Sequence, residues 1–227
     1  MKRNFISAGA VAALVVMGMA LSPAPVLATP SFIFNINTPT GGAISYGGGN
    51  APLVGGGVTV DFVTAIPGAP FPCVSCTLNF RTGNLTGTTA ATWTFGSGGF
   101  INIRGGVPLA GIPTGSLLLT GLFTGKTTVT DVGASLKISG GAFSDTKPAL
   151  APFYGFPPGQ QFHGALGLTF LSGSSPPSGF TSRPGNSING TAANNPVPEP
   201  SSLLLLGSGL LGLAAYGRKK IKNMMNS

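Results

Sequence analysis

The chain has 227 residues, of which 42% are hydrophobic and only 7% are charged, and its formal net charge is +8. Six cations and one acid near the two ends supply +5 of this charge, and the other +3 is spread singly along the central part. Because no basic run is interleaved with aromatic residues, nucleic-acid binding is excluded as the reason for the charge. The apolar content suffices for the core of one domain.

The N-terminal stretch has the three parts of a secretory signal peptide. Lys2 and Arg3 are followed by an apolar run over residues 8–21 and then by a small-x-small pattern that ends at Ala28. We therefore predict cleavage before Thr29. The alternative is an uncleaved N-terminal anchor, which two nearby prolines and the shortness of the apolar run disfavour.

Residues 29–171 have the pattern of an all-β body. Short runs of β-forming residues, often alternating with polar ones, are separated by Gly-rich stretches, and no window keeps a helical period. An antiparallel β-sandwich or jelly-roll-like body is favoured over a β-solenoid, because no fixed-period repeat occurs. The predicted strands are 31–37, 58–63, 77–81, 91–95, 100–104, 117–123, 127–130, 135–139 and 163–171.

Two connections between these strands have a distinct composition. The Gly-rich residues 96–99 predict a hairpin that joins strands 91–95 and 100–104. Residues 148–159, rich in proline and aromatic residues, predict a long loop. Its aromatic side chains either cap the end of the core or form a ligand face.

The only two cysteines, Cys73 and Cys76, have the spacing of a redox dithiol or of half a metal site. A redox pair needs a helix N-terminus to lower the thiol pKa, whereas here a strand follows. A zinc site needs two further ligands, and the chain has one histidine and no other cysteine. We therefore predict a local disulfide that shapes a turn before strand 77–81, with no metal and no cofactor.

Few side chains of the body are suited to catalysis. His163 is the only histidine, and the Gly-x-Ser-x-Gly motif that a Ser-His-Asp enzyme of the α/β-hydrolase type would have is absent. A glycoside hydrolase needs a pair of carboxylates, for which only Asp61, Asp131 and Asp145 are available in the body. We predict no catalytic residues and no enzymatic activity, with an Asp pair as the alternative left open.

The pattern of alternating β-forming residues ends after Leu171. Residues 172–196 are rich in Ser, Gly, Pro and Asn and have too few apolar side chains to bury a core. This composition predicts a flexible stalk.

Three features follow one another at the C-terminus. The tripeptide Pro198-Glu199-Pro200 comes first, and an uncharged Leu/Gly-rich segment spans residues 201–217. Seventeen residues are the lower limit for a single transmembrane helix, and flanking cations favour the cytoplasmic side. The basic cluster that closes the segment consists of Arg218, Lys219, Lys220 and Lys222.

This order of features over residues 197–222 resembles the PEP-CTERM sorting signal of Gram-negative bacteria that make extracellular polysaccharide. The resemblance implies that an exosortase, a membrane-embedded protease or transpeptidase with a catalytic cysteine, cuts at or near the tripeptide. It also implies export through the inner membrane, transient anchoring there, and a final place on the cell surface or outside the cell. The alternative is an ordinary C-terminal anchor that is never cut.

The chain thus divides into a signal peptide, a β-rich body, a stalk and a sorting segment at residues 1–28, 29–171, 172–196 and 197–222. We expect a surface or matrix protein with a structural or adhesive role linked to exopolysaccharide. The first alternative is a carbohydrate-binding module that uses Trp93, Tyr46 or Tyr154 to stack on sugars. A glycoside hydrolase-like enzyme is the third hypothesis.

Overall fold

The computed structural model describes residues 31–37, 41–66, 68–145, 149–156, 160–172, 174–182, 188–196 and 209–210. Within them the chain is all-β, as predicted, with one short 3-10 helix (η1, Pro108–Ala110) in the body. The strands are β1 Ser31–Ile36, β2 Ala43–Tyr46, β3 Pro52–Ile66, β4 Pro70–Thr88, β5 Thr92–Phe95, β6 Phe100–Val107, β7 Ile112–Phe123, β8 Thr127–Asp131, β9 Ser135–Gly140, β10 Phe143–Asp145, β11 Phe162–Leu171, β12 Phe180–Thr181 and β13 Asn189–Pro196.

The predicted signal peptide lies outside the described residues, and so does the predicted transmembrane segment apart from residues 209–210. In the part of the chain that the structure describes, no helix combines the length and the hydropathy needed to cross a bilayer.

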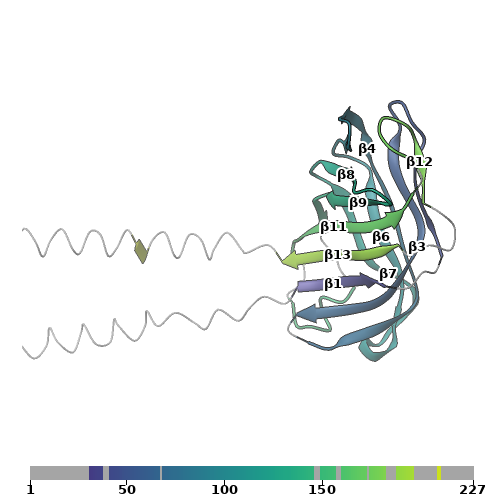
Figure 1. The fold of residues 1–227 in the computed structure, drawn as a ribbon. Helices are drawn as coiled ribbons and strands as arrows, with labels where there is room; N and C mark the ends of the chain where they lie inside the picture. Colours follow the sequence, from purple (N-terminus) through teal and green to yellow (C-terminus); the bar gives the residue numbers. More distant parts are fainter. Residues whose placement is uncertain are drawn as a thin grey trace, which may run out of the picture.

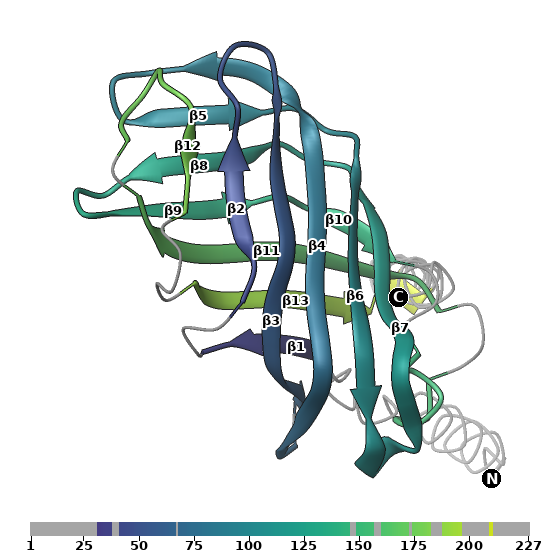
Figure 2. The ribbon, with the colours of Figure 1, turned by 90° about the vertical axis from the view of Figure 1, so that its right-hand side faces the viewer.

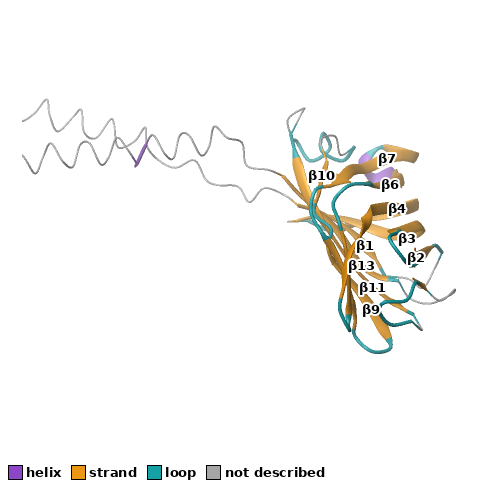
Figure 3. Ribbon diagram, turned by 90° about the horizontal axis from the view of Figure 1, so that it is seen from above, coloured by secondary structure: helices purple, strands orange, loops and turns teal. Residues whose placement is uncertain are grey.

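The strands form one continuous antiparallel sheet that folds into two facing layers (Figure 1). The front layer contains β2, β3, β4, β6 and β7, and the back layer contains β1, β13, β11, β9, β8 and β5. The strands of one layer run across those of the other, as in orthogonal sheet packing (Figures 2 and 3). The body is therefore sandwich-like, but its two layers belong to a single sheet.

Strands that change layer make the corners of this sandwich. The long strand β4 pairs with β6 through residues 74–81 and with β5 through residues 85–88. β5 and β6 thus follow one another along the same edge of β4, one in each layer. The chain between them turns at Gly96, whose N–H donates to Asn84 O (2.9 Å), and at Gly98, whose N–H donates to Phe123 O (2.8 Å).

The predicted hairpin between strands 91–95 and 100–104 is therefore wrong. β5 pairs with β4 and β8, and β6 pairs with β4 and β7. The glycines of residues 96–99 serve a corner instead of a hairpin turn, because a glycine backbone fits both. Gly99 shows how tight the corner is: its φ is +77°, and a Cβ there would collide with Arg81 O.

The core lies between the layers and is formed by every second side chain of the strands, the ones that point inward. Phe32 and Phe34 of β1, Phe80 of β4 and Phe170 of β11 are almost completely buried. At one end of the sandwich the rings of Trp93 and Phe180 meet with their centroids 4.9 Å apart. Burial of such large rings contributes strongly to the apolar area that stabilises the fold.

The predicted stalk at residues 172–196 is wrong where the structure describes it. Phe180 of β12 is buried in the core, and β13 pairs with β11 through residues 189–196 and with β1 through residues 190–194. Ala192 and Asn194 of β13 face inward and are fully buried. A segment of small and polar residues forms a strand here because its backbone pairs with both neighbouring strands. Its own side chains therefore contribute little to its stability.

Replacing Ala192 by Asp tests whether β13 is a core strand. Its side chain is completely buried, so an unpaired carboxylate there should lower the free energy of unfolding by at least about 3 kcal/mol. Ala193→Asp is the matched control, because the neighbouring side chain points to the outer side of the sheet. Thermal unfolding followed by circular dichroism compares the two variants. Equal stabilities would mean that residues 188–196 do not belong to the core.

Candidate functional site

The predicted processing sites lie outside the described residues. These are the signal cleavage site at Ala28 and Thr29, the tripeptide at 198–200 and the basic cluster at 218–222. The structure does place the strands next to them. β1 begins at Ser31 and β13 ends at Pro196, and the two strands pair antiparallel with Phe32 opposite Asn194. The body is therefore entered and left at the same side (Figure 1).

A disulfide joins Cys73 and Cys76, as predicted. It lies inside β4, where the register with both β3 and β6 shifts, and Ser75 between the cysteines has a φ of +51°. Cys76 is buried so closely against Gly105 that a Cβ on that glycine would collide with Cys76 Sγ. The bond thus staples a bulge within a long strand instead of the predicted turn before a strand.

Two of the three predicted stacking residues are core residues. Trp93 and Tyr46 are 0% and 2% exposed. The indole Nε1–H of Trp93 donates to Ser178 O (3.1 Å), and the hydroxyl of Tyr46 donates to Gly49 O (2.7 Å). Neither ring can stack on a sugar, because its faces are covered by protein. The prediction that they form a sugar platform is therefore wrong.

Tyr154, the third stacking residue, lies in the loop before β11 and is half-buried. Its ring packs against Phe32 with a centroid distance of 5.3 Å and lies nearly parallel to Phe71 at 6.4 Å. Burial raises the pKa of the Tyr154 hydroxyl. The ring thus caps one end of the core, which is one of the two roles expected for this loop.

The carboxylates predicted as catalytic candidates do not gather at one site. Asp61 is on β3 in the front layer, where its Oδ2 accepts from the backbone N–H of Asn37 (2.7 Å). Asp131 ends β8 in the back layer and accepts from Ser175 Oγ (2.8 Å) and Gly133 N–H (2.9 Å), and these bonds lower the pKa of its carboxyl. Asp131 therefore orders a turn.

The other candidates are equally dispersed. Asp145 ends β10, opposite Phe162. His163 is exposed on β11, opposite Ser144 on one side and Asn195 on the other. Among the described residues, no group of three or more His, Cys, Asp or Glu side chains is arranged to hold a metal ion.

The outward side of the front layer, whose strands lie side by side in Figure 2, has an ordered chemical pattern that the sequence interpretation missed. Its residues form three rows across β3, β4, β6 and β7, which we call the front face. The first row is Val54, Arg81 and Phe100, the second is Asn79, Asn102 and Thr120, and the third is Thr59, Thr77 and Arg104.

The two arginines are the charged groups of the front-face rows. Both are exposed, and neither forms an ion pair within the described parts of the chain. Phe100, which is 42% exposed, lies opposite Arg81 on the neighbouring strand. In residues 77–81 and 100–104, every second residue belongs to the front face. The sequence shows this alternation in each segment, but only the pairing of β4 with β6 shows that the two sets of residues form one surface.

A second feature is an open depression of about 550 Å³ at the far end of β11. Its polar side chains are those of Ser135, Thr169 and Asn189. Hydroxyls and an amide without a base or a cation offer hydrogen bonds but no means of transferring a proton near neutral pH. We therefore assign no chemistry to this depression.

Comparison with known proteins bears on the tail. A family model described as the PEP-CTERM protein-sorting motif matches residues 196–220. No curated protein and no solved structure matches the chain. The match begins at Pro196, the last residue of β13, so the motif follows the folded body directly. The motif indicates export and a place at the surface or outside the cell. The chain therefore carries a PEP-CTERM protein-sorting motif and is a C-terminally sorted exosortase substrate.

Proposed function

We propose that the protein is a surface or matrix protein without enzymatic activity, whose body binds exopolysaccharide through the front face. The apolar segment 201–217 anchors the chain in the inner membrane until the exosortase cuts at the tripeptide. The observation that carries the binding role is the arrangement of amide, hydroxyl and guanidinium groups in three rows on one exposed sheet surface.

The chemistry of the front face suits an acidic polysaccharide. Amide and hydroxyl side chains exchange hydrogen bonds with sugar hydroxyls, and a guanidinium binds a carboxylate through two parallel hydrogen bonds. Arg81 and Thr77, the partner of Arg104, are four residues apart on β4, so the Cα positions of the two arginines are about 13 Å apart along the strands. Two acidic groups of one extended polymer chain can reach both cations.

The distribution of the carboxylates supports a binding role over hydrolysis. A glycosidase needs two carboxyl groups about 5–10 Å apart on either side of the bond that it cuts. Asp61 and Asp131 lie in different layers, and each already accepts a local hydrogen bond. The burial of Trp93 and Tyr46 likewise favours contacts through the polar front face over an aromatic stacking platform.

Replacing Pro198, Glu199 and Pro200 with Ala tests the processing step. The wild-type protein from its native host should have an intact mass that ends near residue 198 and should be found in the outer or extracellular fraction. The variant should stay uncut in the inner membrane, because the exosortase no longer finds its motif. A wild-type chain that still ends at Ser227 in the membrane fraction would contradict processing.

The double variant Arg81→Gln/Arg104→Gln tests the front face. Its affinity for the acidic exopolysaccharide of the native host should fall at least about fivefold at low salt, since two exposed ion pairs are lost. Affinity gel electrophoresis measures this, and added salt should weaken wild-type binding.

The matched control is Lys126→Gln/Lys137→Gln, which removes the same charge from exposed positions away from the front face. Equal losses in the two double variants would mean that net charge and not the front face binds the polymer. Wild-type protein that is not retarded at all would reject polysaccharide binding.

A further inference from the structure

The end of the body at which the chain enters and leaves has an unusual concentration of rings. Six aromatic residues there form one connected cluster through centroid distances of 4.9 to 6.4 Å. We call it the aromatic end, and its members are Phe32, Phe71, Phe153, Tyr154, Phe156 and Phe162. We infer that, while the tail is uncut, the aromatic end lies against the outer interface of the inner membrane, an inference that rests on the anchoring step of the proposed function.

The length of the tether is the first argument. β13 is paired up to its last residue, because Pro196 lies opposite Phe162 of β11. The apolar segment begins at Ser201, five peptide steps later, and five extended steps span at most about 18 Å. The headgroup region of one leaflet takes up about 5–8 Å of that length. A folded body held this closely cannot stand clear of the bilayer surface.

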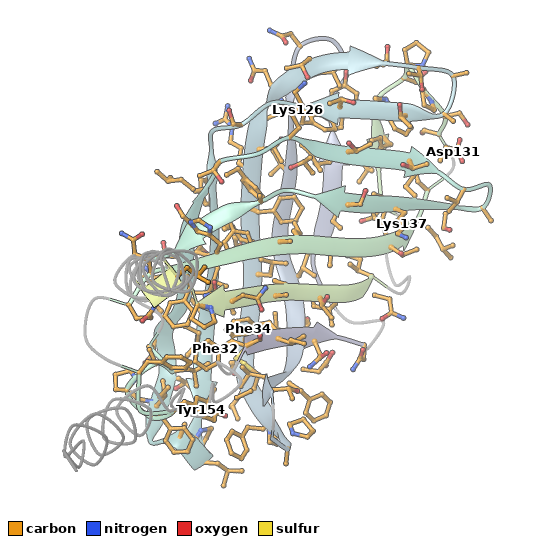
Figure 4. All side chains as sticks on the ribbon, turned by 90° about the vertical axis from the view of Figure 1, so that its left-hand side faces the viewer. Phe32, Phe34, Lys126, Asp131, Lys137 and Tyr154 are labelled. Carbon is orange, nitrogen blue, oxygen red and sulfur yellow. A yellow bond between two sulfur atoms is a disulfide. The ribbon has the colours of Figure 1, made fainter. Side chains whose placement is uncertain are left out.

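The direction in which the body faces is the second argument. Ser31 of β1 lies beside the end of β13, and β3 ends opposite Ser31, at Ile66. The turn between β3 and β4 is thus at the same end. Phe71 comes just after this turn in β4 and pairs with Val63 of β3. The tether therefore leaves from the part of the body that carries the ring cluster, as the position of Tyr154 near the start of β1 also shows (Figure 4).

The exposed part of the aromatic end fits a lipid interface. Phe153 is 46% exposed and packs edge-on against Phe71 and Tyr154, with centroid distances of 5.9 and 4.9 Å. Two apolar side chains beside the aromatic end are also exposed. Phe62, paired with Pro72 near the β3–β4 turn, is 38% exposed. Leu109 in η1 is 67% exposed, and η1 is at the same end because it follows β6, whose Gly106 pairs with Val74 near the start of β4. Aromatic side chains on a rigid base prefer the boundary between headgroups and acyl chains.

Three charged side chains lie far from the aromatic end, whereas Asp145 ends β10 opposite Phe162, one of its members. Lys126, Asp131 and Lys137 lie at the opposite end of the body from Tyr154 (Figure 4). Asp61, next to Phe62, has its Oδ2 bonded to the backbone of Asn37. The orientation leaves the front face exposed at the side of the body and holds the tripeptide at the membrane surface, where a membrane-embedded enzyme can reach it.

An introduced tryptophan tests the inference. Full-length Phe153→Trp and Lys126→Trp variants are reconstituted in vesicles of ordinary or brominated phosphatidylcholine, beside the wild type. Trp93 is buried in all three proteins and provides a common background. The added emission of Phe153→Trp should be lost in brominated lipid, because bromine quenches indole only at contact, whereas that of Lys126→Trp should be unchanged. Leu109→Trp serves as a second probe of the same end if Phe153→Trp does not fold.

The outcomes separate this inference from the proposed function on which it rests. A chain that alkaline carbonate removes from the vesicles would overturn the anchoring step and the inference together. An anchored chain whose Phe153→Trp and Leu109→Trp emissions are both unquenched would overturn the inference and leave the proposed function standing. Equal quenching at residue 126 would also overturn it, because the body would then lie on the membrane without a preferred end.

Discussion

The pairing of β13 with both β1 and β11 is the constraint on which the rest of the structure depends. It joins the first and last described strands of the body within one layer, so the two ends of the folded chain lie side by side in the interior of the sheet. It also places the small buried side chains of Ala192 and Asn194 beside the buried rings of Phe34 and Phe32. Because β13 ends where the sorting motif begins, the same pairing sets the distance between the folded body and the tail.

The short distance between the body and the tail links the fold to the proposed sorting of the protein. If the tail is anchored as proposed, a body on a long flexible stalk would tumble freely above the membrane, whereas a body paired up to Pro196 would be held at its surface. In the proposed arrangement the aromatic end faces the bilayer, and the arginines of the front face remain open to the polymer outside. Under the proposed function, the cations near the termini set the topology, and Arg81 and Arg104 serve recognition.

Alternation predicted the strands that carry their own apolar side chains, such as those at 31–37, 100–104 and 135–139, because each buries one face. The Cys73–Cys76 bond followed from the absence of other ligands. β13 was missed because its neighbours stabilise Asn189–Pro196, a property that its own composition does not contain. The hairpin failed because glycines suit a corner as well as a turn, and the front face required the pairing of β4 with β6. The sorting motif was found because its features are contiguous in the sequence.

Hydrogen–deuterium exchange of the amides of residues 189–195 in the full-length protein tests the central claim most directly. If β13 is paired on both sides, these amides should be protected to the same extent as those of β11, since opening either strand requires the sheet to open. Exchange at the rate of an unstructured chain, with β11 still protected, would contradict the account. Residues 189–195 would then be a flexible stalk, and the short tether would no longer hold the body at the membrane.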